Sequence, residues 1–293
     1  MYDFTKYEAL GNDYVVIDPG HTAFEPTPEL VRQVCDRHFG LGADGVLYGP
    51  LPAADGYRLR TFNADGTECE KSGNGLRIFA QYLRDAGYTD ADAFVLHTSA
   101  GPAPVRILDP AAGTVGVDLG PATLDSLAVG ATGPRRTMLR EPLTAADAAW
   151  TATCVHLGNP HCVIEPGAAA VDEALARRLG PAVRDHELFP HRINLELLDV
   201  VDHDRIRIEV FERGAGYTLA SGSSACAAAV AAHALGLTGP RVTVEMPGGT
   251  VAVGIDGDGR VSLTGEVRAV LQGHWAPRLS RRLAGPRPVE GAA

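Results

Sequence analysis

The sequence is poor in lysine and has no long apolar run. Lys6 and Lys71 are its only lysines. A Schiff base with pyridoxal phosphate and a phosphate-binding loop both use a lysine, so this scarcity disfavours either kind of site. No apolar run approaches the roughly 18 residues that a membrane-spanning helix needs. We therefore expect no pyridoxal phosphate and no membrane partner.

Signals for secretion, metal binding and nucleic-acid binding are missing as well. The opening residues, MYDFTKYEAL, carry charges and show no apolar segment with a cleavage site, so we expect a cytoplasmic protein. A net charge of -10 without a basic stripe argues against nucleic acid as a partner. The cysteines are odd in number and form no CxxC pair, which predicts reduced thiols and no zinc site. They are Cys35, Cys69, Cys154, Cys162 and Cys226.

What the chain does contain is an internal repeat. Its length of 293 residues favours two domains. The segment LGNDYVVID (10–18) matches LGNPHCVIE (157–165), and SGNGLRIFA (72–80) matches SGSSACAAA (221–229). The distance between the two matching segments is nearly the same in both copies. Gly-Asn and Ser-Gly are common turn dipeptides, but turn preference alone does not explain matched spacing. We therefore expect a duplicated unit.

Local patterns predict the elements of each copy. The runs VVID and CVIE read as strands, and YRLRTFN (57–63) and RIRIEVFE (205–212) alternate as half-buried strands do. Helices are predicted at 76–87 and 225–236, and hairpin-rich strands in 241–273. The second helix is nearly all small and apolar, so it must be enclosed by protein. This pattern predicts a sheet wrapped around a central helix.

Each copy places a serine at the start of its helix, and each serine lies nine residues after a polar residue, Asn63 or Glu212. A helix N-terminus has unpaired N–H groups and the positive end of the dipole, so it suits a carboxylate or a phosphate. If the copies pack about a pseudo-dyad, Ser72 and Ser221 lie on opposite sides of one carbon. One group per face is the geometry of stereoinversion. The alternative is that both serines only cap their helices.

Two longer segments, FNADGTECEKSGNGLR (62–77) and FERGAGYTLASGSSACAAA (211–229), resemble the signatures of the diaminopimelate epimerase family. Gly-Asn-Pro-His (158–161) and RHFGLGADGV (37–46) are also similar to that family, and the resemblance runs from about Phe4 to Trp275. It implies an α+β fold of two pseudo-symmetric domains, each a mostly antiparallel β-sheet wrapped around a central α-helix. The active site then lies in the cleft between the domains and uses no cofactor.

On this resemblance the first domain covers residues 1–118 with a returning strand near 266–275, and the second covers 119–265. Family members are commonly dimers, so a homodimer is expected. The tail at 276–293, rich in proline, arginine and glycine, is expected to be disordered.

The resemblance also implies a set of site residues. Positions that hold the distal amino and carboxylate groups of the substrate are matched by amide and guanidinium side chains: Asn12, Asn63, Asn159, Asn194 and Arg213. Backbone amides that bind the α-carboxylate correspond to Gly73, Asn74, Gly222 and Ser223. Glu212 and His161 fall near the reacting centre. Taken singly, each asparagine is more often a turn residue than a ligand, and a lone histidine is more often a core residue. As a set in family positions the asparagines favour a ligand site, and the place of His161 beside Asn159 in the repeat favours a site role for it.

Departures from the family pattern put the reaction in question. Ser72 and Ser221 stand where the family has two catalytic cysteines, and a hydroxyl is a far weaker acid than a thiol, whose ordinary pKa is about 8.5. Tyr217 stands in place of a glutamate and Ser224 in place of a small residue, usually glycine. The cysteine mechanism therefore cannot be carried over.

Three hypotheses follow. The chain is a cofactor-independent isomerase or epimerase acting at the α-carbon of an amino acid related to diaminopimelate, or a lyase on the same fold. Its base is then His161, Glu212 or Glu70, with serine as proton relay. The second hypothesis is a catalytically silent amino-acid-binding homologue. The third is an engineered Cys-to-Ser variant, which the further changes at Tyr217 and Ser224 disfavour.

Two weaker motifs are interpreted as ordinary structural features without a catalytic or cofactor-binding role. GLGADG (40–45) fits GxGxxG, but no strand precedes it, so we expect a loop without a dinucleotide. Lys71 beside Ser72 suggests a Ser-Lys pair, but neighbours in an extended segment point to opposite faces, so we expect Lys71 on the surface.

Overall fold

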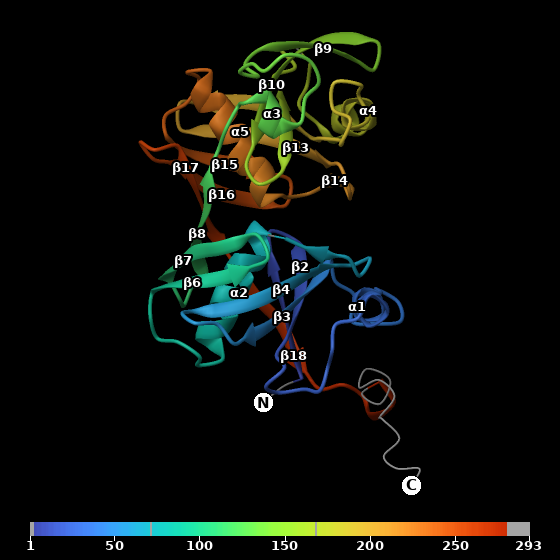
Figure 1. The fold of residues 1–293 in the computed structure, drawn as a ribbon, viewed down its shortest axis with the longest axis vertical. Coiled ribbons are helices and arrows are strands. Elements are labelled where there is room, and N and C mark those ends of the chain that lie inside the picture. Colours follow the sequence, from blue (N-terminus) through green and yellow to red (C-terminus); the bar gives the residue numbers. More distant parts are fainter. Residues whose placement is uncertain (1–2, 71, 168, 280–293) are drawn as a thin grey trace. The chain divides into compact units, whose positions relative to one another are not determined.

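The computed structural model describes residues 3–70, 72–167 and 169–279. The chain divides into two compact units, the first made of Met1–Val115 and Val267–Ala293 and the second of Gly116–Glu266. The division falls inside strand β8 (Thr114–Pro121), and so does the boundary at 118 and 119 that the sequence suggests. Figure 1 shows the strands and helices of each unit.

The first unit is a mixed, mostly antiparallel sheet. Its strands are β1 (Phe4–Ala9), β2 (Asn12–Ile17), β3 (Gly45–Leu51), β4 (Tyr57–Asn63), β5 (Glu68–Cys69), β6 (Ala93–Thr98), β7 (Gly101–Asp109) and β18 (Arg268–Gly273). Strand β1 pairs antiparallel with β2 and β18. The pairs β2–β3 and β4–β6 are parallel, because the chain between their strands crosses over. The pairs β3–β4 and β6–β7 are antiparallel.

Helix α2 (Gly73–Asp85) is the central helix of this unit, and α1 (Pro28–Cys35) is a shorter amphipathic helix. Strands β1, β2, β3 and β7 all contact α2. Its side chains Ile78, Phe79 and Leu83 are fully buried. Burial of large apolar side chains on a helix that strands surround supplies the main stabilisation of such a unit.

The second unit has the same order of strand pairings. Its elements are β9 (Glu141–Ala145), β10 (Ala148–His156), β11 (Pro160–Ile164), β12 (Asn194–Asp202), β13 (Arg205–Glu212), β14 (Gly216–Thr218), β15 (Arg241–Met246), β16 (Gly249–Ile255), β17 (Arg260–Glu266), α3 (Ser126–Val129), α4 (Glu173–Arg184) and α5 (Gly222–Ala234). Strands β10 and β11 are antiparallel, β11 and β12 parallel, β12 and β13 antiparallel, and β13 and β15 parallel.

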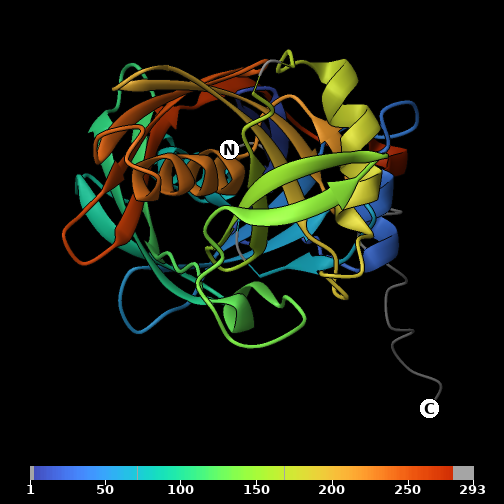
Figure 2. The same cartoon turned by 90° about the horizontal axis from the view of Figure 1, so that it is seen from above.

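Helix α5 lies inside the strands of its unit, as Figure 2 shows. It contacts β10, β11, β12, β13, β15, β16 and β17. From Ala225 to Ala229 its side chains are all fully buried. The small side chains of α5 let strands pack closely on all its sides, so the prediction of a sheet wrapped around an enclosed apolar helix is confirmed.

Several other expectations concern single segments. The hairpin expected after residue 240 is formed by β15 and β16. Of the tail expected to be disordered, residues from 280 on lie outside the described part, whereas residues 277–279 are helical and Leu279 packs against a core that contains Trp275. Lys71 also lies outside the described residues. Among the described helices, none combines the length and the apolar character needed to cross a membrane.

Candidate functional site

In the first unit the Gly-Asn turn is joined to the start of α2 by a chain of amides. Asn12 opens β2, and Asn74 is the second residue of α2. Asn74 Nδ2 donates to Asn12 Oδ1 over 3.1 Å, and the buried Arg77 donates from Nη2 to Asn74 Oδ1 over 2.7 Å. The side-chain amide of Asn74 is therefore fixed at both ends.

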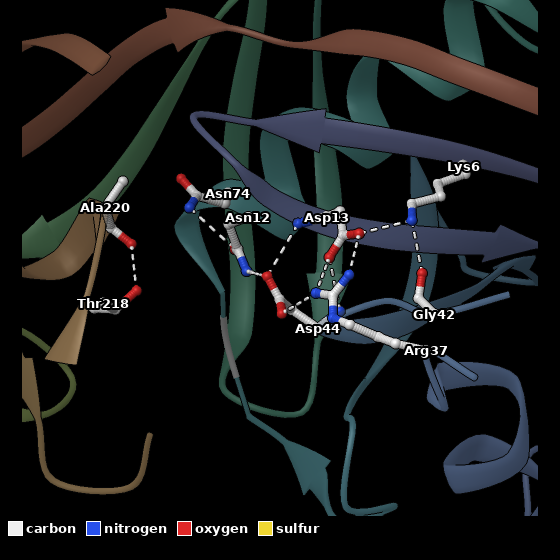
Figure 3. A network of polar contacts seen from close by, with 9 residues as sticks. All are labelled: Lys6, Asn12, Asp13, Arg37, Gly42, Asp44, Asn74, Thr218 and Ala220. Atoms are coloured by element: carbon white, nitrogen blue, oxygen red, sulfur yellow. Dashed lines mark hydrogen bonds and ion pairs between the residues drawn. The ribbon is translucent and has the colours of Figure 1, made fainter. Parts of the chain in front are cut away.

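The other end of Asn12 is bound by an aspartate from the GLGADG loop. Asn12 Nδ2 donates to Asp44 Oδ2 over 2.9 Å, and Arg37 donates to Asp44 Oδ1 over 2.8 Å (Figure 3). The segment is a loop, as predicted, and leads directly into β3. Asp44 is a supporting residue that the sequence interpretation missed, although it lies within the RHFGLGADGV segment that resembles the family.

Asp13 completes the network. Its carboxylate binds Lys6 Nζ at 2.7 Å and Arg37 Nη2 at 3.0 Å, and it accepts from the backbone N–H of Asp44 over 2.9 Å (Figure 3). Burial acts to raise the pKa of Asp13, but the hydrogen bonds and charges of Arg37 and Lys6 outweigh it, so the pKa lies below its ordinary value. Asp13 is thus a charged residue that fixes the Asp44 backbone beside Asn12.

The second unit contains the corresponding arrangement with different residue types. Asn159 Nδ2 donates to the hydroxyl of Ser223 over 3.5 Å, and Ser223 is the second helical residue of α5, as Asn74 is of α2. Asn159 Oδ1 lies 2.9 Å from His161 Nε2, and His161 Nδ1 lies 2.7 Å from Glu196 Oε1. His161 and Glu196 are both fully buried. The Gly-Asn turn is therefore tied to its helix in both units.

Ser72 and Ser221 differ in what their hydroxyls bind. Ser72 is the N-cap of α2, and its Oγ accepts from Gly75 N over 3.1 Å and lies 3.2 Å from the Tyr14 hydroxyl. Ser221 is the N-cap of α5 but makes no side-chain cap hydrogen bond. Ser72 therefore caps its helix through its hydroxyl, whereas Ser221 occupies the N-cap position without a side-chain cap hydrogen bond.

The residue three positions after the N-cap serine also differs between the units: it is Gly75 in the first and Ser224 in the second. A Cβ placed at Gly75 would lie 3.3 Å from Ser72 Oγ and 3.0 Å from a Leu47 methyl carbon. Three residues after Ser221, the same step of α5, the chain carries Ser224, whose Cβ occupies the corresponding place on the helix. Its hydroxyl is fully buried and has no hydrogen-bond partner within the described part of the chain.

Asn194, Arg213 and Glu212 lie where the ends of β12 and β13 meet. Asn194 Nδ2 donates to the carbonyl of Pro160 over 3.1 Å, and its Oδ1 accepts from Arg213 N over 2.8 Å. The backbone of Arg213 is thus fixed while its side chain is exposed to solvent. Glu212 is half-buried at the end of β13. Because β11, β12 and β13 are neighbours, these residues lie at the same sheet edge as Asn159.

Asn63 and Glu70 occupy the equivalent edge of the first unit and are exposed. Asn63 ends β4 and donates from Nδ2 to Thr67 Oγ1 over 2.9 Å, within the turn to β5. Glu70 follows β5 and has an exposed side chain. Asn63 is therefore an exposed residue whose side chain hydrogen-bonds within its own turn.

Tyr217 belongs to a separate polar cluster. Its hydroxyl donates to Glu209 Oε2 over 2.8 Å, and Arg177 lies over its ring at 4.5 Å. Burial raises the pKa of Glu209 above its ordinary value, against the lowering effect of the Tyr217 hydrogen bond. Tyr217 thereby links β14 to α4 rather than extending the polar edge around Asn159.

Backbone donors complete the two helix starts. Gly73 and Asn74 begin α2, and Gly222 and Ser223 begin α5. The first N–H groups of a helix have no intrahelical acceptor, so they are available to an anion. Over residues 3–70, 72–167 and 169–279, no group of three or more His, Cys, Asp or Glu side chains is placed to hold a metal ion.

Comparison with known proteins places this geometry in a family. The diaminopimelate epimerase profile matches residues 4–124 and 153–270. Diaminopimelate epimerase 2 of Nostoc sp. is 44% identical over 277 residues, which cover 94% of this chain and 96% of the relative. Diaminopimelate epimerase of Synechocystis sp. is 40% identical over 277 residues, covering 92% and 97%.

Solved structures share the fold at low sequence identity. A hydroxyproline epimerase from Agrobacterium vitis with bound trans-4-hydroxy-L-proline superposes with a TM-score of 0.65 at 16% identity, over 92% of this chain and 90% of that one. A phenazine biosynthesis protein of Bacillus anthracis gives a TM-score of 0.62 at 15% identity, over 92% and 97%. The sequence matches and the two-unit α+β fold agree: this chain belongs to the diaminopimelate epimerase family of enzymes.

Proposed function

We propose that this protein is a cofactor-independent epimerase that acts at the α-carbon of diaminopimelate or a close relative of it. The observation that carries the proposal is the paired arrangement in which each Gly-Asn turn is hydrogen-bonded to the start of a central helix, through Asn74 in one unit and Ser223 in the other. A helix start binds a carboxylate, and fixed amides bind an ammonium or carboxylate group.

Substrate recognition follows from these groups. In this proposal the backbone amides of Gly73, Asn74, Gly222 and Ser223 bind the α-carboxylate. The exposed guanidinium of Arg213 binds the distal carboxylate through two parallel hydrogen bonds, because its backbone is held by Asn194. The family membership and the high identity to diaminopimelate epimerases support this choice of substrate.

Proton transfer is assigned to the two serines, which we propose take the places of the family's two cysteines. In this proposal one hydroxyl removes the α-proton and the other returns a proton to the opposite face. A serine hydroxyl needs a partner that accepts its proton. His161 is a poor choice because both of its ring nitrogens are hydrogen-bonded. We propose Glu212, half-buried at the end of β13, or the exposed Glu70 as the base.

A second candidate function is binding without turnover. It is favoured by one observation: the Ser72 hydroxyl is already committed to Gly75 N and lies within hydrogen-bond distance of Tyr14. A hydroxyl held in this way is less free to transfer protons. The recognition groups serve this function equally well.

Incubation with LL- and meso-diaminopimelate in deuterated water separates the two functions. An epimerase incorporates deuterium at Cα and interconverts the isomers, as mass spectrometry and chiral chromatography report. Calorimetry run in parallel shows whether each isomer binds. The double variant Ser72→Ala with Ser221→Ala, purified in the same way, controls for epimerase from the expression host. Binding without any incorporation of deuterium would refute the epimerase and leave the binding protein.

A further inference from the structure

Glu196 is a buried acid that the proposed reaction does not use. It lies on β12, two residues after Asn194, and is fully buried. One carboxyl oxygen lies 2.7 Å from His161 Nδ1, and the other, Oε2, has no hydrogen-bond partner among the residues described. Burying such a pair costs more desolvation free energy than apolar side chains of the same size would, so stability does not account for it.

The hydrogen-bonding capacity of each atom restricts how the protons are placed. Asn159 Oδ1 can only accept, so His161 Nε2, at 2.9 Å, must carry a proton. The contact between His161 Nδ1 and Glu196 Oε1 needs a further proton, carried by either atom. The pair therefore holds one proton more than a neutral histidine beside a carboxylate. Without Glu196, a neutral histidine would have to choose between its two ring nitrogens.

We infer that Glu196 is a positioning residue that acts through His161 to orient the side-chain amide of Asn159. By keeping a proton on Nε2, Glu196 turns Asn159 Oδ1 toward His161 and Nδ2 toward Ser223. The second N–H of the amide and one lone pair of its oxygen are then presented to a ligand in a fixed direction. This inference rests on the proposed function in one respect, that Asn159 binds the ligand.

In the first unit the turn asparagine is also oriented by an acidic side chain, but its amide donates to that side chain. There Asp44 accepts from Asn12 Nδ2 over 2.9 Å, so the amide is oriented by an acceptor instead of a donor. Asn12 Oδ1 then receives its hydrogen bond from the helix start, at Asn74. Each turn asparagine is thus linked by hydrogen bonds to an acidic side chain, directly in the first unit and through His161 in the second. Glu196 with His161 fills in the second unit the place that Asp44 fills in the first.

The substitution Glu196→Gln tests the inference because it keeps the shape of the side chain and removes the shared proton. The introduced amide can accept from Nδ1–H or donate to Nδ1, so Nε2 is no longer required to carry a proton and the Asn159 amide is no longer held in one orientation. We expect the Kd and KM for meso-diaminopimelate to rise at least tenfold, kcat to change less than threefold, and the midpoint of urea unfolding not to fall. Glu209→Gln is the matched control, since Glu209 is a buried glutamate of β13 that hydrogen-bonds Tyr217 instead.

A double-mutant cycle with Asn159→Ala tests whether Glu196 affects ligand binding through Asn159. If Glu196 acts through Asn159, Glu196→Gln has no further effect on Kd in the Asn159→Ala background. An unchanged Kd in Glu196→Gln, an equal rise in Glu209→Gln, or an undiminished effect in the Asn159→Ala background would each overturn the inference.

Nitrogen-15 NMR of labelled histidine gives a readout that needs no ligand. The His161 signals are expected to show a proton on Nε2 in the wild type and its loss in Glu196→Gln. Should the wild type fail to bind diaminopimelate, the proposed function fails, yet this measurement still decides on Glu196. Retention of the Nε2 proton in Glu196→Gln would then refute its part in orienting Asn159.

Discussion

Asn74 donates a hydrogen bond from its side-chain amide to Asn12 Oδ1 over 3.1 Å, which joins the start of α2 to the turn before β2. In the second unit Ser223 and Asn159 have the same relation, but Asn159 is the donor. A duplicated backbone arrangement thus carries two hydrogen-bond chains of opposite direction.

The two N-cap serines should differ in their effect on stability. Ser72→Ala removes the hydrogen bond to Gly75 N and is expected to lower the free energy of unfolding by about 1 kcal/mol. Ser221→Ala removes no cap hydrogen bond and should cost less than about 0.5 kcal/mol. Urea unfolding of both variants tests this difference, with Ser72→Thr as the control that keeps a capping hydroxyl. Equal losses for the two alanine variants would contradict it.

Ser224→Ala is expected to stabilise the protein. Within the described part of the chain the Ser224 hydroxyl is buried without a partner, and alanine has the higher helix propensity. Removing an unsatisfied buried hydroxyl should raise the free energy of unfolding by about 1 kcal/mol. Thermal or urea unfolding measures the change, and Ser223→Ala, which removes a hydroxyl bonded to Asn159, is the comparison. A loss of stability in Ser224→Ala would show that its hydroxyl is hydrogen-bonded.

Much of the fold was open to prediction from the sequence because its signals are local. The apolar run of α5 and the alternation in β4 and β13 are local patterns, and the helix and both strands are confirmed, although β13 is buried on both faces from Ile208 to Phe211. The duplicated Ser-Gly segments likewise marked the helix starts. Such patterns can be recognised from a few neighbouring residues.

The supporting residues of the site could not be found in this way. Asp44 is 32 residues from Asn12, and Glu196 is 35 residues from His161, so their contacts depend on the register of parallel strands. Nothing in the local sequence around Glu196 distinguishes a buried acid on a strand from a solvated one.

Asp13 should make stability depend on pH in the acid range. Its pKa in the folded protein is lower than the ordinary value of about 3.9, so its contribution is fully present above about pH 4 and is lost as the pH falls toward the folded pKa. Asp13→Asn, which loses the bonds to Lys6 and Arg37, should cost about 2 kcal/mol at pH 7. The difference from wild type should narrow below pH 4.

Urea unfolding of wild type and Asp13→Asn between about pH 3 and 7 provides the measurement. Asp90→Asn, at an exposed position, is the control. A difference between wild type and Asp13→Asn that stays constant over this range would contradict the assignment of a lowered pKa to Asp13.

Arg213→Lys separates charge from geometry in the recognition of the distal carboxylate that we propose for Arg213. Lysine keeps the positive charge but lacks the planar fork that makes two parallel hydrogen bonds. We expect the KM for meso-diaminopimelate to rise about tenfold, equivalent to about 1.4 kcal/mol. Binding of lysine, which has no distal carboxylate, should change little in calorimetry. An equal loss of affinity for both ligands would place Arg213 elsewhere in the site.

The most direct test of the proposed epimerisation is the exchange of the α-proton by single-serine variants in deuterated water. Ser72→Ala and Ser221→Ala are incubated separately with LL- and with meso-diaminopimelate, and deuterium at each α-carbon is followed by NMR. If the serines act on opposite faces, each variant exchanges at least tenfold more slowly from one starting configuration while it still binds, and the two variants fail on opposite isomers. Exchange at the wild-type rate in both variants would contradict the account.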